Sequence, residues 1–178
     1  MGVKLAAASG GSIELVPTNT ASNFTVTVPA VTGTMLTTAT AGTVLQVVNA
    51  TTSTAVTNAS VTYADTGLTA SITPTSTTSK ILVLVSQNGV YKSTSDTSAN
   101  FKLLRNSTDL SIFCRYGAAS GSTAFIGVAS ASTNYLDSPA TTSSTTYKTQ
   151  IASDSGTSLA GCQVASAVST ITLMEIAA

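Results

Sequence analysis

Serine and threonine make up about a third of the 178 residues, and this composition limits the kinds of fold that the chain can adopt. Threonine is β-branched and suits a half-buried pleated surface, whereas serine competes with helices through local hydrogen bonds to the backbone. No window of 11 residues shows a convincing 3.6-residue apolar period, which an amphipathic helix would need. With 43% hydrophobic residues the chain can still collapse around a core. We therefore expect a folded protein built from strands and turns.

The apolar pattern predicts a compact all-β domain over residues 43–178. The run at residues 80–85 is apolar at consecutive positions, as expected of a central strand that is covered on both faces. Residues 101–105 and 110–116 predict a hairpin with a four-residue turn. The other expected strands lie at residues 44–48, 60–63, 68–73, 81–87, 124–130, 134–136, 145–151 and 170–176. Their number and spacing predict a jelly-roll-like antiparallel β-sandwich.

Residues 1–42 predict a separate segment with two short strands. Residues 11–17 alternate apolar and polar side chains up to a proline, and residues 23–29 do the same. Two short strands bury too little surface to be stable alone, so we expect this segment to dock on another subunit or protein. The apolar side chains that would form the attachment surface are Ile13, Leu15, Phe24, Val26 and Val28.

Charge is scarce and balanced, which excludes several functions. The chain has seven Lys and Arg, seven Asp and Glu, and no His or Trp. Nucleic-acid binding needs basic clusters, which are absent. The sequence has no histidine to act as a catalytic base, no cluster of carboxylates and no residues at the spacing of metal ligands. We therefore expect that the protein is not an enzyme and binds no metal and no cofactor. A pair of carboxylates that cleaves glycans is a weaker alternative.

Tyrosines provide the candidate ligand-binding residues. Tyr91, Tyr116, Tyr135 and Tyr147 fall near predicted loops or strand ends, where a ring could stack on a sugar. The more ordinary interpretation is partial burial of an amphipathic ring. The two cysteines are too few for a disulfide framework, and the sequence does not decide whether they pair. We find no signal peptide and no run of apolar residues that could span a bilayer.

Several segments resemble structural proteins of tailed bacteriophages. The stretches GSIELVP at residues 11–17 and FTVTVPAVTGT at residues 24–34 look like an element of phage fibre proteins. The stretches VLQVV at 44–48, DTGLTASITP at 65–74, SKILV at 79–83, LLR at 103–105 and ITLMEI at 171–176 are similar to a domain of small structural proteins of marine phages, especially those that infect cyanobacteria. The resemblance implies a homotrimer that is fixed to the particle by its N-terminal segment.

The resemblance and the composition together predict a non-enzymatic virion protein. A chain this short has no long fibre shaft, so we expect a head fibre or capsid decoration protein that displays the β domain on the particle surface after assembly in the host cytoplasm. Its partners would be other copies of itself and capsid or tail proteins, without nucleic acid or membrane insertion. The alternative is a short tail fibre or fibre tip that binds host glycans as an adhesin.

Overall fold

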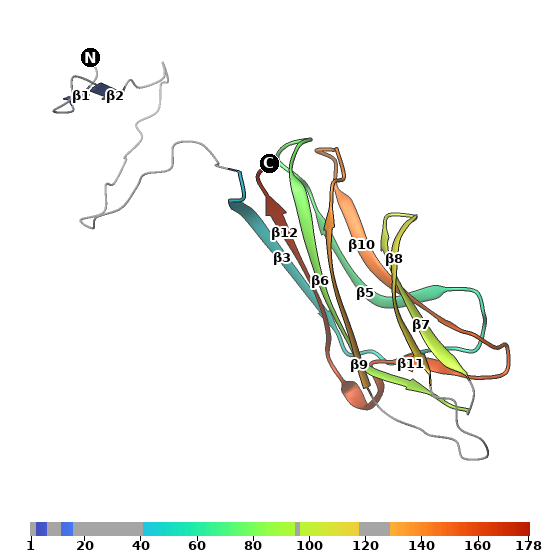
Figure 1. Ribbon diagram of the computed structural model, residues 1–178. Helices are drawn as coiled ribbons and strands as arrows, with labels where there is room; N and C mark the ends of the chain where they lie inside the picture. The colour runs from blue at the N-terminus through green and yellow to red at the C-terminus, as the bar shows by residue number, and fades with distance from the viewer. Residues whose placement is uncertain (1–2, 7–11, 16–40, 95–96, 118–128) are drawn as a thin grey trace. The chain divides into compact units, whose positions relative to one another are not determined.

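The computed structural model describes residues 3–6, 12–15, 41–94, 97–117 and 129–178, and the chain divides into two compact units, Met1–Met35 and Leu36–Ala178. In the first unit β1 (Val3–Ala6) pairs antiparallel with β2 (Ser12–Leu15) (Figure 1). The strand expected at residues 11–17 contains β2. The strand expected at residues 23–29 lies outside the described residues, so Phe24, Val26 and Val28 do as well.

The second unit is an all-β sandwich, as the sequence predicts. Its strands are β3 (Val44–Thr52), β4 (Val56–Asn58), β5 (Ala64–Ile72), β6 (Lys80–Lys92), β7 (Ser98–Arg105), β8 (Thr108–Gly117), β9 (Ala129–Asp137), β10 (Thr145–Ser153), β11 (Ala160–Cys162) and β12 (Ser169–Ile176). One sheet has the order β5-β10-β7-β8. The other has the order β3-β12-β6, with β9 on the far edge of β6 (Figure 1).

The strand pairing is nested, and this identifies the fold as a jelly roll. β3 pairs with β12, β5 with β10, β6 with β9, and β7 with β8, all antiparallel. Such a series of nested pairs, wrapped so that consecutive pairs enter alternate sheets, gives the eight-stranded jelly roll with four long strands in each sheet. The expected jelly-roll-like topology is therefore confirmed, including its last strand.

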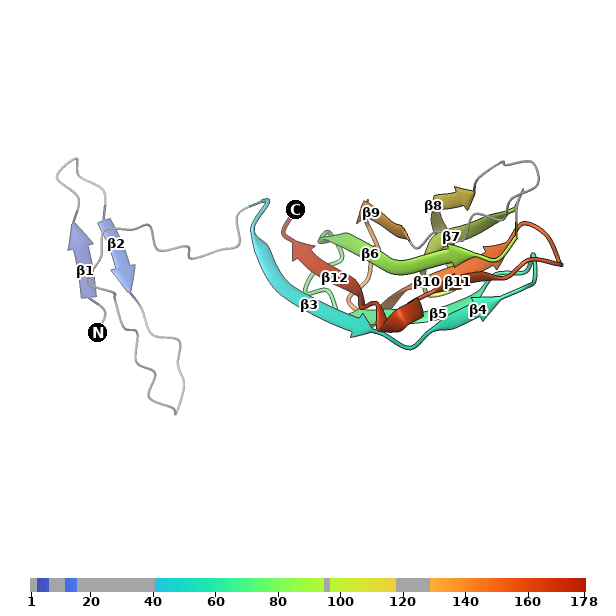
Figure 2. The same ribbon diagram turned by 90° about the horizontal axis from the view of Figure 1, so that it is seen from below.

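Two of the long strands are interrupted at the same level. β11 and β12 both pair with β6, and the residues between them leave the sheet as a 3-10 turn at Val164–Ser166. β4 continues beside β11 as β3 runs beside β12 (Figure 2). Gly89 of β6 faces this turn with φ +62°, and a Cβ on it would lie 2.6 Å from the backbone nitrogen of Val164. The interruption thus needs a glycine at this point of β6.

The core between the sheets consists of two apolar clusters. The larger combines side chains of both sheets: Leu68, Ala70, Ile72, Ile81, Val83, Val85, Leu103, Tyr147, Ile171 and Leu173. The smaller lies around Val90, Ala99, Phe101, Ala131, Ile151, Ala160 and Cys162. Phe113 packs against both clusters, and its ring centroid lies 6.1 Å from that of Phe101. The hydrophobic surface that drives folding is therefore buried between the two sheets.

Three expectations about local structure are wrong. Residues 60–62 form bends and residue 63 is irregular, so no strand forms here, because the side chains of Asn58 and Ser60 accept hydrogen bonds from the backbone two residues ahead. The hairpin turn has two residues rather than four, since Arg105 pairs directly with Thr108. Within this single chain the run at residues 80–85 is covered on one face only: Ile81, Val83 and Val85 are buried, whereas Leu84 is exposed.

Candidate functional site

The outer face of the sheet β5-β10-β7-β8 carries paired charges, of which the carboxylates are exposed and the lysines are largely covered. The carboxylate of Asp65 accepts hydrogen bonds from Lys148 at 2.9 Å and from Gln150 at 2.7 Å. On the neighbouring strands, Lys102 donates to Asp109 at 2.9 Å. Because strand side chains alternate between the faces, Lys148 and Gln150 point away from the core that Tyr147 enters. These side chains form a polar surface across four strands.

One aromatic ring belongs to this polar surface. The ammonium group of Lys102 lies 4.5 Å from the centre of the Tyr63 ring, a cation–π contact. Tyr63 is partly buried and lies directly before β5. An aromatic face beside carboxylate, amide and ammonium groups is the chemistry with which proteins bind sugars. We name Tyr63, Asp65, Lys102, Lys148 and Gln150 the polar platform. Nothing in the sequence around Tyr63 distinguishes it from the other four tyrosines.

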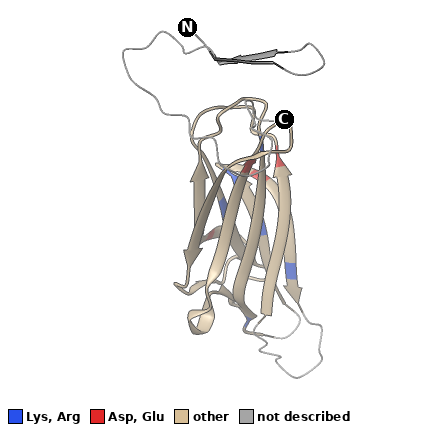
Figure 3. Ribbon diagram, turned by 90° about the vertical axis from the view of Figure 1, so that its left-hand side faces the viewer, with Lys and Arg blue, Asp and Glu red and all other residues tan. Residues whose placement is uncertain are grey.

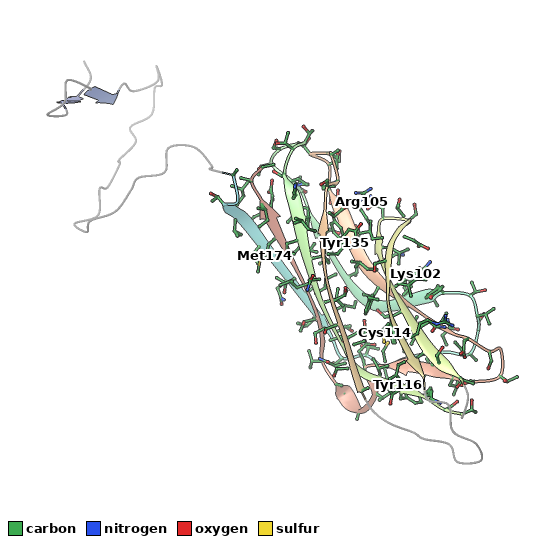
Figure 4. All side chains as sticks on the ribbon, viewed as in Figure 1. Lys102, Arg105, Cys114, Tyr116, Tyr135 and Met174 are labelled. Atoms are coloured by element: carbon green, nitrogen blue, oxygen red, sulfur yellow. The ribbon has the colours of Figure 1, made fainter. Side chains whose placement is uncertain are left out.

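The tyrosines selected from the sequence lie elsewhere, and one of them cannot bind a ligand in this structure. Tyr147 is completely buried in the core, so its assignment as a ligand-binding residue is wrong: its strand alternates toward the core at this position. Tyr135 and Tyr116 are partly buried and pack against the two core clusters (Figure 4). Tyr91 lies against Gly161, so closely that a Cβ there would overlap the ring. These four residues come from four strands and are not drawn together by any described contact.

The hydroxyl of Tyr147 has a structural role. It donates a hydrogen bond of 2.6 Å to Asp137, and Arg105 donates to both oxygens of the same carboxylate at 2.8 and 2.9 Å. Asp137 ends β9 in one sheet, whereas Arg105 and Tyr147 belong to the other sheet. Burial and the hydrogen bond to Asp137 raise the pKa of Tyr147 far above its usual value. This group is a buried clamp between the two sheets.

A second buried carboxylate, that of Glu175, also links separate parts of the sandwich. Glu175 of β12 accepts hydrogen bonds from Gln46 at 2.6 Å and from the backbone and hydroxyl of Thr75 at 2.7 Å each. Burial alone would raise the pKa of Glu175, but these donors outweigh it and lower the pKa to about 2. The carboxylate therefore stays charged and joins β3, β12 and the loop after β5.

A chain of uncharged polar groups crosses the middle of the core. The hydroxyls of Thr66 and Thr149 share a hydrogen bond of 2.5 Å, and Thr149 donates to Gln87 at 2.9 Å. Gln87 donates to Ser169 at 3.2 Å, and Gln163 donates to the same oxygen at 3.1 Å. All five side chains are fully buried. They come from both sheets, so the sandwich is joined by hydrogen bonds at its centre as well as near one end.

Every Asp and Glu side chain within residues 41–94, 97–117 and 129–178 has a structural partner. Asp154, the one not yet named, accepts a hydrogen bond from Ser98 at 2.8 Å. The two cysteines are free thiols; burial raises the pKa of Cys162 to about 12 and also raises that of Cys114, so neither favours the thiolate. In the described ranges no three His, Cys, Asp or Glu side chains come together as a metal site requires.

The N-terminal attachment residues can be placed only in part. Ile13 and Leu15 lie in β2, where they pair with Leu5 and Val3 of β1. Over the described residues, no helix has the length and apolar character needed to cross a membrane.

No family model matches the sequence, and no curated protein matches it either.

Proposed function

We propose that this protein is a non-enzymatic structural component of a bacteriophage particle, a homotrimeric head fibre or capsid decoration protein. The observation that carries the proposal is the set of buried polar side chains that link distant strands of the jelly roll by hydrogen bonds. Charged clamps at Asp137 and Glu175 and the polar chain through Gln87 join strands that are distant in sequence. Such groups contribute little net stability compared with apolar side chains, but they favour one arrangement of the strands over others. A particle component that must keep its shape outside a cell benefits from this rigidity.

The state of the carboxylates supports a role without catalysis. A glycosidase requires one carboxyl group that can donate a proton and a second that can act as nucleophile or base. Within residues 41–94, 97–117 and 129–178 each Asp and Glu carboxylate accepts hydrogen bonds within the fold, and the pKa of Glu175 is lowered, which is the opposite of what a general acid needs. Residues 1–42, which include the compact unit Met1–Met35, are the segment that we assign to docking on a capsid or tail protein.

Electron microscopy of intact particles tests the proposal. Antibodies raised against the purified full chain should label the surface of particles of the virus that encodes it, and the chain should be detected in purified particles by mass spectrometry. Gold label on the head supports a head fibre or decoration protein, and label at the tail tip supports the alternative location. Particles that contain no trace of the chain would overturn the proposal.

A second function, glycan binding by a short tail fibre or fibre tip, is favoured by the polar platform. Tyr63 and Lys102 could contribute stacking and hydrogen bonds to a sugar, and several copies on one particle would multiply a weak affinity. A glycan array probed with the full chain should give a signal that Tyr63→Ala abolishes. Tyr135→Ala, on the other sheet and partly in the core, is the control for nonspecific loss. A signal that survives Tyr63→Ala, or no signal with the unaltered chain, excludes this surface as the binding site.

A further inference from the structure

The outer side of the sheet formed by β3, β12, β6 and β9 is apolar. In β6 the side chains of Ile81, Val83 and Val85 enter the core, so Leu82 and Leu84 lie on the opposite face. The consecutive apolar residues at this point are typical of a strand with protein on both sides, yet the described chain supplies a layer on only one. The pattern of β6 therefore indicates that something else covers its outer face.

The register extends this apolar character across four strands. Val47 of β3 lies opposite Met174 of β12, which lies opposite Leu82 of β6, and Leu82 in turn pairs with Leu136 of β9. Val47 is 56% exposed and Leu136 is 54% exposed. Figure 4 shows Met174 on β12 and Lys102 on β7 at opposite sides of the sandwich. The residues of this surface, which we name the apolar face, are Val44, Val47, Leu82, Leu84, Leu136, Met174 and Ile176.

The apolar face and its edges carry one exposed charge. Within β3, β12, β6 and β9 the charged side chains are Lys80, Lys92, Asp137 and Glu175, and only Lys80, at the start of β6, is exposed. The edge strands β3 and β9 carry no exposed charge that would deter another strand. In contrast, Asp65 and Asp109 lie exposed on the two edge strands of the other sheet. The strands in Figure 3 are mostly tan, the colour of uncharged residues, which shows how few charges the fold carries.

We infer that the apolar face seats a second copy of this chain. Apart from Lys80, which pairs with Ile176 at one end of the face, the faces of neighbouring copies can meet without like-charge repulsion and without removing charges from water. A charged partner would find only this one charge on the face. The seven side chains expose on the order of 400 Å². With uncharged neighbours such as Asn49, Thr51 and Asn134, the face approaches the roughly 800 Å² per partner of a stable interface. The area and the chemistry thus fit self-association.

This inference rests on the proposed function, because it names the surface through which the copies of that oligomer meet. Sedimentation of the full-length chain over a range of concentrations measures its association. Leu136→Lys places an ammonium group on the apolar face, and Ile112→Lys is the matched control, because Ile112 is 62% exposed on β8 of the other sheet. We expect the Leu136→Lys protein to dissociate with a constant raised on the order of a hundredfold, and the control to behave like the unaltered chain.

A second variant guards against misfolding. Val47→Thr keeps the shape and the strand propensity of the side chain, so it should weaken association measurably while the circular dichroism spectrum stays unchanged. If the unaltered chain is an oligomer that both face variants leave intact, the inference is overturned while the virion proposal stands. If the unaltered chain is monomeric at every concentration, the inference and the homotrimer fail together, but labelling of particles still tests the virion role separately.

Discussion

Removing the carboxylate of Asp137 should destabilise the protein far more than removing an exposed carboxylate that makes a similar ion pair. Asp137 is only 5% exposed and accepts hydrogen bonds from Arg105 and Tyr147. In Asp137→Ala, the Tyr147 hydroxyl would remain buried without an acceptor, which costs about 1–3 kcal/mol. Arg105 would lose its charge partner, and breaking a buried pair costs about 3–5 kcal/mol.

The expected total lies at the lower end of the sum of these terms. The side chain of Arg105 is 26% exposed, so water can replace part of the lost contact. We expect Asp137→Ala to lower the free energy of unfolding by about 4–5 kcal/mol. The matched control is Asp109→Ala, because Asp109 pairs with Lys102 at the surface with 62% of its side chain exposed. Its loss should cost less than about 1 kcal/mol.

Urea unfolding followed by circular dichroism measures both variants, with all proteins at one concentration because association contributes to apparent stability. Tyr147→Phe separates the two terms: it removes only the hydroxyl and should cost about 1 kcal/mol. Equal midpoints for Asp137→Ala and Asp109→Ala would refute the reasoning, since the clamp would then contribute no more than a surface ion pair.

Two further predictions concern the Glu175 cluster and the interrupted strand. Because the folded pKa of Glu175, about 2, lies below its ordinary value of 4.5, its stabilisation is complete above pH 4.5 and is lost as the pH falls toward 2. Melting temperatures measured between pH 7 and pH 2 should show this loss, and Glu175→Gln should flatten that part of the profile; an unchanged profile would contradict the assignment. Gly89→Ala should destabilise the fold by about 3 kcal/mol or more, because a Cβ there meets the backbone of Val164. Gly67→Ala, at φ +79° with no atom nearer than 4.0 Å, isolates the strain of the backbone and should cost only about 1–2 kcal/mol; a smaller effect at Gly89 would contradict this account.

Most of the strands could be predicted because their signals are local. Alternation in residues 145–151 and 170–176 requires only that one face of the strand be buried, and β10 and β12 include these residues. The strand predicted at residues 60–63 does not form, because side chains there accept hydrogen bonds from the backbone. The short strand β11 was missed because Gly161 and its neighbours have no strand preference, and pairing with β4 and β6 defines it.

The candidate site was less predictable than the fold. A tyrosine in an alternating strand gives no sign of which face it occupies, so Tyr147 was expected to bind a ligand although it enters the core. The contact of Tyr63 with Lys102 joins residues from distant parts of the chain and leaves no local pattern.

The amino-acid sequence by itself determined the class of fold and the small number of charged residues. β-branched residues, alternation and turn residues act over a few positions, so they define strands wherever the chain goes. Only the tertiary structure decided which side chains meet. The pairing of β3, β12, β6 and β9 brings Val47 and Leu136 onto one apolar face, while Asp137 reaches Arg105 across the core. Such contacts depend on the nested order of strands, which is a property of the whole chain rather than of any segment.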